Sequence, residues 1–515
     1  MIQNLLFIQP PLVEEAEKHF ENEILIWPVY IQNFLNKHYP KLKSDLLYLP
    51  LELKNGGFSL KSPDDIKNLY SKLDELTNTL DYNLSDNSMI LISGTTNSYF
   101  LVSKIIAEYF HKYYNSSLIL YGGAAASASA DDFIYDGSPI DFQIQGEGEL
   151  NLLNLLKQNP KKQNIPQVIN NHPIPDLNEL PMIDFAIFNK YIKNFNTLSI
   201  NLSRGCPYSC EFCQEFRIFR NVKKIPRWRA YTPQRAIKEF GRMVNYGLMN
   251  NIVDFGLYDS VFALSADWLR KFLGGFSFQG IKSIWTETRI DILNKSLIKS
   301  MQNKHIFLWM GVEHFSPRIL KLMNKTSNPK NYLNKIFDIF NIFNSLNYRF
   351  SINLIANYPG TTMKDESILY DTLDDLIDNG KIDPTNISLK KFHIFPGNSL
   401  YDSFTFNGEN RFYIPQLKSI AYFPKWWKNK DTLENGLFCV RPSQKFSLRK
   451  SLNMFYSRYE KLLNLYLDIL KESKPKDFFL RTLFIQKQIK HLFSNQKQIF
   501  DFLDQNNIEL EENCD

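Results

Sequence analysis

The middle of the chain contains six short apolar runs that alternate with segments of helical periodicity. Strands that alternate with helices over about 200 residues are typical of a parallel barrel or a partial barrel. Folds of this kind place their chemistry at the carboxyl ends of the strands, so functional residues are expected directly after the runs. The runs comprise residues 195–203, 251–260, 283–291, 306–316, 349–360 and 387–397.

The segment after the first run holds three of the five cysteines of the chain, Cys206, Cys210 and Cys213. Structural zinc takes four protein ligands, usually as two separated pairs, and no second pair or nearby histidine follows here. A 4Fe–4S cluster also has four iron corners, normally with four thiolates. Three cysteines therefore leave one iron open to an exchangeable ligand, which is how a cluster performs chemistry besides carrying electrons.

The sequence Cys206-Pro-Tyr-Ser-Cys210-Glu-Phe-Cys213 resembles the CxxxCxxC loop of the radical S-adenosylmethionine (radical SAM) superfamily. The resemblance implies that the open iron binds the amino and carboxylate groups of S-adenosylmethionine. Electron transfer then cleaves the sulfonium to a 5′-deoxyadenosyl radical. The backbone of Phe212, just before the third cysteine, is expected to contact the adenine. A reactive or zinc-bound cysteine cluster is the alternative.

Three later runs resemble other segments of the same superfamily. In "GVEHFSPRILKLMNK", Glu313 matches the acid that bonds the ribose hydroxyls, although a glutamate at a strand end also commonly pairs with a neighbouring lysine. In "WTETRID", the resemblance implies that Arg289 holds the methionine carboxylate, and in "NLIANYPGTT" that Gly360 lets backbone approach the adenine. Ordinary packing or turn roles are the alternatives for both. Asp259, at the end of the second run, either belongs to this site or caps a helix.

The first 150 residues contain another alternating pattern. The apolar runs 89–97, 116–125 and 141–149 end in glycine-containing turns, and residues 98–114 between the first two have helical periodicity. A strand, a helix and a second strand at this length predict a parallel, doubly wound α/β domain. Its ligand crevice is expected at the carboxyl ends of the strands.

The turns of this domain resemble those of the cobalamin-binding domain fused ahead of many radical SAM enzymes. Their glycines let backbone approach a bulky ligand, and their hydroxyls can bond its polar tail. The Asp-x-His-x-x-Gly motif of the better-known cobalamin fold is missing around residues 45–57, so the resemblance implies no histidine on cobalt. A domain that kept the fold and lost the ligand is the alternative. The implied cobalamin contacts are Ser93, Gly94, Thr95, Gly122, Gly123, Ala124, Gly146 and Glu147.

With 515 residues, the chain is too long for one ordinary core. We predict an α/β protein with an N-terminal Rossmann-like domain, a central partial (β/α)6 radical SAM barrel and a helical C-terminal subdomain. A Pro-, Asn- and Lys-rich segment without sustained periodicity is expected to link the first two. The predicted boundaries are 1–156 for the cobalamin-binding domain, 157–195 for the linker, 196–405 for the barrel and 406–515 for the helical domain.

Charge and apolar content limit the partners and the compartment. The net charge of +6 is too small to argue for nucleic acid. No apolar stretch reaches the roughly 18–20 residues of a membrane span, and no secretory signal is recognised, so a soluble cytoplasmic protein is expected. One basic cluster is either a solvated loop or the lining of a channel for an anionic ligand. Its members are Arg217, Arg220, Lys223, Lys224, Arg227 and Arg229.

Together these resemblances predict an enzyme, a cobalamin-dependent radical SAM methyltransferase. It would methylate an unactivated carbon or phosphorus of a small natural product or a peptide, with flavodoxin or ferredoxin as electron donor. One S-adenosylmethionine would recharge cobalamin and a second would supply the radical. The alternatives are a radical rearrangement, cyclisation or oxidation without methyl donation by cobalamin, and a non-catalytic sensor. An RNA methylthiotransferase is disfavoured because no three-cysteine cluster precedes Cys206.

Overall fold

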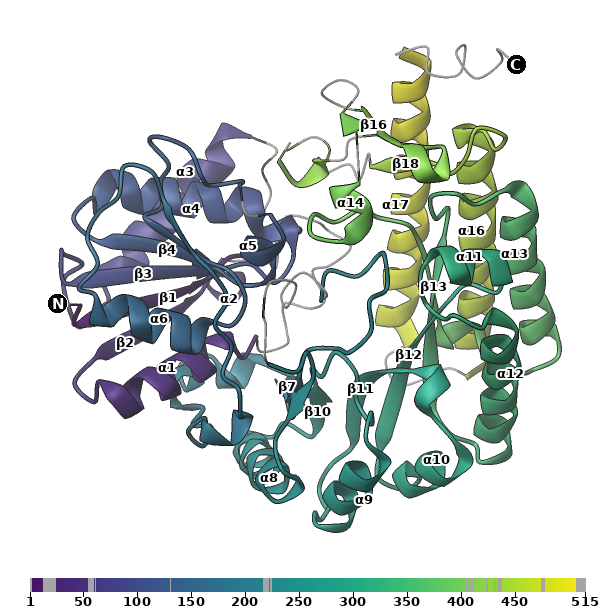
Figure 1. Ribbon diagram of the computed structural model, residues 1–515, viewed down its shortest axis with the longest axis horizontal. Coiled ribbons are helices and arrows are strands. Elements are labelled where there is room, and N and C mark those ends of the chain that lie inside the picture. The colour runs from purple at the N-terminus through teal and green to yellow at the C-terminus, as the bar shows by residue number, and fades with distance from the viewer. Residues whose placement is uncertain are drawn as a thin grey trace.

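The computed structural model describes most of the chain, and two parallel sheets of six strands each dominate it. The N-terminal sheet lies beside the barrel, and the C-terminal helices lie against the outer side of the barrel (Figure 1). None of the helices in the described part is long and apolar enough to cross a lipid bilayer. The described residues are 2–12, 25–53, 60, 62–129, 131–215, 222, 225–403, 405–406, 411–422, 425–428, 430, 432, 438–473 and 478–505.

The N-terminal sheet is parallel throughout, in the order β2-β1-β3-β4-β5-β6. Alternate side chains of a strand enter different cores: Leu5 and Phe7 pack on one face, and Leu6 and Ile8 on the other. Helices cover both faces, which confirms the predicted doubly wound fold. The strands are β1 Asn4–Gln9, β2 Lys43–Tyr48, β3 Ser88–Ser93, β4 Leu118–Gly122, β5 Phe142–Ile144 and β6 Gln167–Ile169; the helices are α1 Trp27–His38, α2 Leu49–Glu52, α3 Pro63–Thr77, α4 Phe100–Tyr113, α5 Ala124–Ala128 and α6 Gly148–Lys157.

The predicted linker, residues 157–195, is more ordered than its composition suggested. Residues 167–169 form β6 and pair with β5, so this part of the linker belongs to the first sheet. Further along, Leu177, Phe188 and Tyr191 are buried in the core. Apolar residues spaced irregularly between prolines pack without helical or strand periodicity, which is why the sequence pattern did not reveal them.

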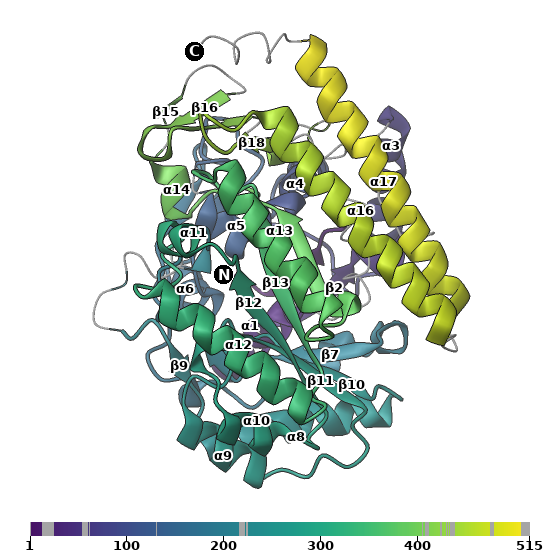
Figure 2. The ribbon, with the colours of Figure 1, turned by 90° about the vertical axis from the view of Figure 1, so that its right-hand side faces the viewer.

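The second sheet contains the six strands predicted from the sequence, all parallel, in the order β7-β10-β11-β12-β13-β14. The edge strands β7 and β14 do not pair with each other within the described residues, so the barrel is partial. Its helices line the outer surface (Figures 1 and 2). The strands are β7 Thr197–Ile200, β10 Asp254–Leu257, β11 Ser283–Arg289, β12 Ile306–Glu313, β13 Phe350–Ala356 and β14 Ile387–Lys391; the helices are α8 Pro233–Met249, α9 Ala266–Gly274, α10 Lys295–Met301, α11 Pro317–Leu322, α12 Pro329–Ser345 and α13 Met363–Asp378.

The C-terminal region is helical as predicted, but a small antiparallel sheet precedes its helices. β15 Thr405–Phe406, β16 Arg411–Ile414, β17 Ser419–Tyr422 and β18 Cys439–Arg441 form this sheet. Strands of two to four residues are too short to show an alternating pattern, so the sequence did not reveal them. α16 Leu448–Ser473 and α17 Phe478–Gln505 form a long antiparallel pair beside α13 (Figure 2).

Candidate functional site

The three clustered cysteines lie in the loop that follows β8, Ser203–Arg204, where the first barrel strand ends. All three are free and partly buried, and the amide of Cys213 donates a hydrogen bond to the carbonyl of Cys210 at 3.1 Å. Burial, and to a smaller extent the charges of Glu215 and the other two thiols, raise the pKa of Cys213 to about 12. Neighbouring thiols are hard to ionise at the same time, because their negative charges repel. A positively charged metal such as iron removes this cost, so the three thiols fit a metal site.

Within the described ranges, no three His, Cys, Asp or Glu side chains converge to hold a single metal ion. The thiolates of a 4Fe–4S cluster bind different iron atoms and do not need to converge on one point. The donor set of the loop therefore fits a cluster. The assignment of Cys206, Cys210 and Cys213 as its ligands stays a prediction.

Arg289, at the end of β11, reaches the cysteine loop. Its Nη1 donates to the Sγ of Cys210 at 3.4 Å, and its guanidinium lies 3.8 Å from the ring centroid of Tyr208. Nε and Nη2 donate to the two carboxylate oxygens of Asp291 at 2.9 Å, and Nη2 also donates to the carbonyl of Lys325 at 2.6 Å. These contacts fix the guanidinium beside the cysteine loop, and the role of Arg289 in holding the methionine carboxylate stays a prediction.

Glu313 ends β12 in an unusual backbone conformation. Its φ is +72°, and the pairing of β12 with β13 shifts register between Gly311 and Glu313. The side chain is buried, and Lys325 Nζ donates to its Oε1 at 2.9 Å. The lysine pairing named as the alternative therefore occurs. It is compatible with ribose binding because an ionised carboxylate has acceptor sites on both oxygens.

Three other sequence-predicted positions have clear local partners. The carbonyl of Phe212 accepts a hydrogen bond from Asn398 at 3.4 Å. Gly360 has φ +88°, a conformation that favours glycine, and donates its amide to the Oγ of Ser419 at 2.8 Å; its contact with the adenine stays a prediction. Asp259 accepts hydrogen bonds at 2.7 Å from the amide of Leu202 and the hydroxyl of Ser203. It thus braces the approach to the cysteine loop and does not cap a helix, and burial raises its pKa to about 6.

A cavity of about 420 Å³ lies between the carboxyl ends of the two parallel sheets. Seven of the eight predicted cobalamin contacts line it, and Gly94 is the exception. A Cβ on Gly94 would lie 2.9 Å from the hydroxyl of Tyr121, so this glycine allows close packing inside the domain. The cavity wall includes Ser93, Thr95, Gly122, Gly123, Ala124, Gly146 and Glu147 from the first domain, and Asn201, Arg204, Gly205, Glu215, Tyr258 and Ser260 from the barrel.

The two adjacent glycines of the cavity wall have different roles. Gly123 has φ +96°, and a Cβ there would lie 2.5 Å from the carbonyl oxygen of Gly94, so the turn itself requires glycine. Gly122 is not in this left-handed region, and the nearest atom to a Cβ there is 3.8 Å away. A side chain at Gly122 would therefore enter the cavity without breaking the turn.

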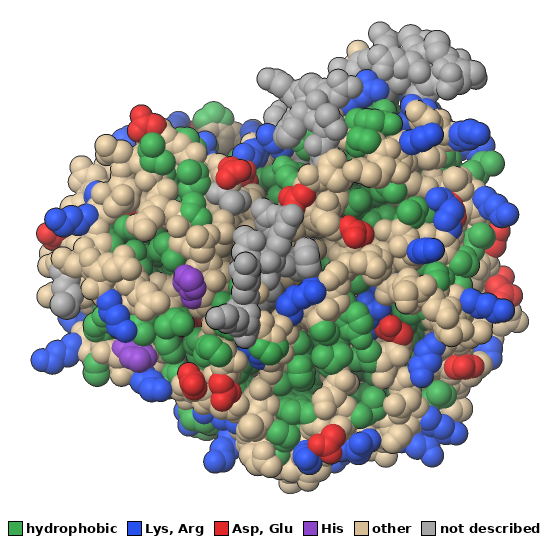
Figure 3. All heavy atoms as spheres, in the orientation of Figure 1, with side chains coloured by type: hydrophobic (Ala, Val, Ile, Leu, Met, Phe, Trp, Pro, Cys, Tyr) green, Lys and Arg blue, Asp and Glu red, His purple; other side chains and the backbone are tan. Residues whose placement is uncertain are grey.

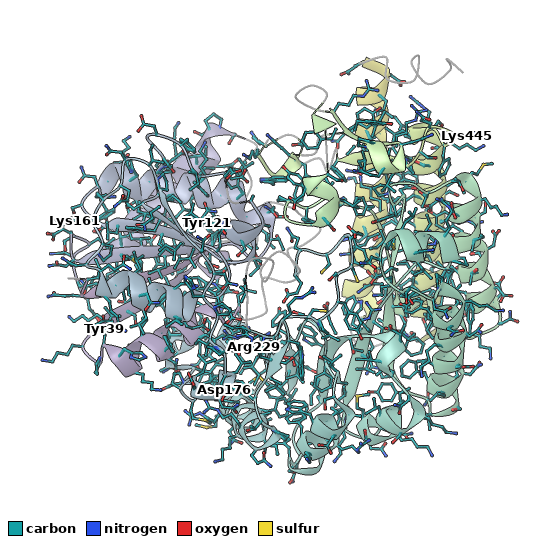
Figure 4. The ribbon with its side chains drawn as sticks, in the orientation of Figure 1. Tyr39, Tyr121, Lys161, Asp176, Arg229 and Lys445 are labelled. Atoms are coloured by element: carbon teal, nitrogen blue, oxygen red, sulfur yellow. The ribbon has the colours of Figure 1, made fainter. Side chains whose placement is uncertain are left out.

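Buried ion pairs join the two domains beside this cavity. Arg204 donates to Glu149 at 2.6 Å and to Glu147 at 3.3 Å, and Arg229 pairs with Glu147. Arg229 lies at the junction of the domains (Figure 4). Burial alone would raise the pKa of Glu149, but Arg204 holds it below its usual value. Sequence analysis missed Arg204 and Glu149, because no local motif shows a pairing across 55 residues.

This geometry changes the interpretation of the basic cluster. Arg229, one of its members, is buried and paired, and Arg227 donates to the Oγ of Ser209 at 2.8 Å. Over the described surface, Lys and Arg are interspersed with Asp and Glu on the face shown in Figure 3. The remaining members, Arg217, Arg220, Lys223 and Lys224, lie outside the described residues.

Comparison with known proteins gives a consistent result. Residues 200–372 match the family model of the radical SAM superfamily. An uncharacterised methyltransferase of Pyrococcus horikoshii is 25% identical over 244 residues, which are 42% of this chain and 50% of that protein. Hopanoid C-3 methylase of Methylococcus capsulatus is 27% identical over 258 residues, which are 46% of each chain. The chain spans about half the length of these curated relatives.

The solved structure of the cobalamin-dependent S-adenosylmethionine radical enzyme OxsB with aqua-cobalamin bound has the same fold. The TM-score is 0.59 at 14% identity, over 99% of this chain and 81% of that chain. The part of the chain that matches the radical SAM superfamily, residues 200–372, contains the cysteine loop and most of the partial barrel. At this identity the likeness is one of fold, and it extends over the doubly wound domain as well as the barrel.

Proposed function

We propose that the protein is a cobalamin-dependent radical SAM methyltransferase that acts on an unactivated carbon or phosphorus. The observation that carries the proposal is a cavity whose wall includes strand ends of both domains. Gly205 and Glu215, which flank the cysteine loop, belong to its wall together with the glycine turns of the first domain. Groups held at these two places would face the same cavity, as transfer between them requires.

Different residues of the chain would bind the cluster and cobalamin. Cys206, Cys210 and Cys213 would hold a 4Fe–4S cluster, and the Gly122 turn would admit the tail of cobalamin. When bound, the cluster supplies the electron that cleaves S-adenosylmethionine, and cobalamin carries the methyl group. The ion pair between Glu149 and Arg204 would hold the two domains together beside the cavity.

The relatives support methylation as the reaction, since two of them are named as a methyltransferase and a methylase. The substrate we propose is a small natural product or a peptide. Flavodoxin or ferredoxin is the proposed electron donor. A radical rearrangement, cyclisation or oxidation remains the second candidate, because the same cysteine loop would serve it.

The products of S-adenosylmethionine test the proposal. Anaerobically reconstituted protein with cobalamin and a reductant should release both S-adenosylhomocysteine and 5′-deoxyadenosine, since the first reports methyl transfer and the second reports radical formation. Mass spectrometry of the released small molecules measures both. Release of 5′-deoxyadenosine without S-adenosylhomocysteine would favour the second candidate. Release of neither, from protein with an intact cluster, would contradict both.

Replacement of Glu313 should weaken the binding of S-adenosylmethionine. The loss in Glu313→Ala should be about 1–3 kcal/mol, the usual cost of leaving a hydroxyl pair unsatisfied in a closed site. Isothermal titration under anaerobic conditions measures it.

Because Glu313→Ala also leaves Lys325 buried without its partner, Glu313→Gln serves as a second variant that keeps the side-chain volume. Glu75→Gln, on the exposed surface of α3, is the control and should bind normally. Unchanged affinity in both Glu313 variants would reduce Glu313 to the structural ion pair.

A further inference from the structure

We propose that Arg289 sets the reduction potential of the cluster through its hydrogen bond to Cys210. The inference rests on the cluster assignment within the proposed function. It starts from the Nη1···Sγ distance of 3.4 Å between a buried guanidinium and the middle cysteine of the loop. Hydrogen bonds to the sulfurs are among the main determinants of the potential of an iron–sulfur cluster.

Arg289 is fixed in this position from several sides. Asp291 accepts from both Nε and Nη2, the carbonyl of Lys325 accepts from Nη2, and Tyr208 stacks beneath the guanidinium. Tyr208 belongs to the cysteine loop itself, so the loop and the arginine position each other. A donor held by this many contacts keeps its N–H directed at the sulfur without a further loss of entropy.

The sign of the effect follows from charge. Reduction adds an electron to the cluster, and a nearby positive donor stabilises the more negative state. Asp291 carries the opposite charge, but it contacts Nε and Nη2 of Arg289, whereas Cys210 contacts Nη1. The side chain of Asp291 is 26% exposed and that of Arg289 is 7% exposed, so solvent screens the charge of Asp291 more strongly. The net effect of Arg289 is therefore a higher, less negative potential.

The test is a redox titration of the reconstituted cluster, followed by electron paramagnetic resonance, without S-adenosylmethionine, cobalamin or substrate. Arg289→Met removes the charge and the donors but keeps the length of the side chain. The ratio of reduced to oxidised cluster at a given potential should fall about tenfold, a negative shift of about 59 mV for one electron. Arg289→Lys keeps the charge without the planar fork and should shift less. The control is Arg458→Gln, on α16, which breaks an ion pair with Asp374 of α13. This variant should not shift the reduction potential.

A second measurement uses the unmodified protein. Arginine labelled with ¹⁵N should give a nitrogen coupling to the reduced cluster in pulsed electron paramagnetic resonance, and Arg289→Lys should lose this coupling. An unchanged midpoint in Arg289→Met, or no coupling in the labelled protein, would overturn the proposal. Neither result depends on methyl transfer, so the proposed reaction can fail while this inference holds. A chain that takes up no cluster at all would refute both.

Discussion

Cys210→Ala should abolish the cleavage of S-adenosylmethionine, and Cys206→Ala and Cys213→Ala should do the same. Each variant removes one of the three thiolates expected to hold the cluster, and the structure offers no nearby cysteine to replace it: Cys439, the fourth described cysteine, is buried in β18. Loss of the cluster removes the electron source, so no residual activity is expected. Iron and sulfide content, the absorbance of the cluster and the yield of 5′-deoxyadenosine measure the effect.

The matched control is Cys439→Ala, which should retain both the cluster and the cleavage reaction. Cys439 is 1% exposed, so this variant is expected to lose some stability by leaving a small cavity, without any change at the loop. Cys514→Ala should also retain activity, although Cys514 lies outside the described residues. Full cleavage by Cys210→Ala would exclude the cysteine loop as the cluster site.

Gly122→Leu should prevent the retention of cobalamin while the absorbance of the cluster stays unchanged. The new side chain would enter the cavity, because the nearest atom to a Cβ at Gly122 is 3.8 Å away and the turn does not require glycine there. Filling a site that must hold a bulky ligand costs at least about 1–3 kcal/mol, so retention should fall tenfold or more. Gel filtration after incubation with hydroxocobalamin measures it. Gly123→Val is a poorer variant, since its Cβ would collide with the carbonyl of Gly94.

Gly274→Leu, at the exposed end of α9 with open space around it, is the control and should retain cobalamin. The spectrum of the retained cobalamin is the second readout. Among the described residues no histidine lines the cavity, so the spectrum should lack nitrogen ligation from the protein. A histidine-ligated spectrum, or no retention by the unmodified protein, would remove methylation as the favoured chemistry and leave the radical reaction in place.

The sequence predicted the parts of the fold that depend on regular periodicity. All six barrel strands form where apolar runs end in turns, because a buried parallel strand needs a continuous apolar run. β6 and the sheet from β15 to β18 were missed, because strands of two to four residues are too short to show an alternating pattern.

In the candidate site, too, the residues with a local signal were predicted and the long-range contacts were not. The glycine turns at Gly122 and Gly146 were found because glycine has a local conformational meaning, and they do line the cavity. The hydrogen bond of Arg289 to Cys210 joins residues 79 positions apart, and no spacing rule anticipates it. Motifs therefore identified the loops that matter, whereas the partners of individual side chains required the folded chain.

The buried ion pairs of Glu147 and Glu149 with Arg204 and Arg229 have a consequence for protein engineering. If a different first domain covered the barrel, Arg204 and Arg229 would be buried without their carboxylates, and an unpaired buried charge costs about 3–5 kcal/mol. Neither half is then a freely exchangeable module. A chimaera that takes its first domain from another protein would have to bring both acids with it, in register with the two arginines.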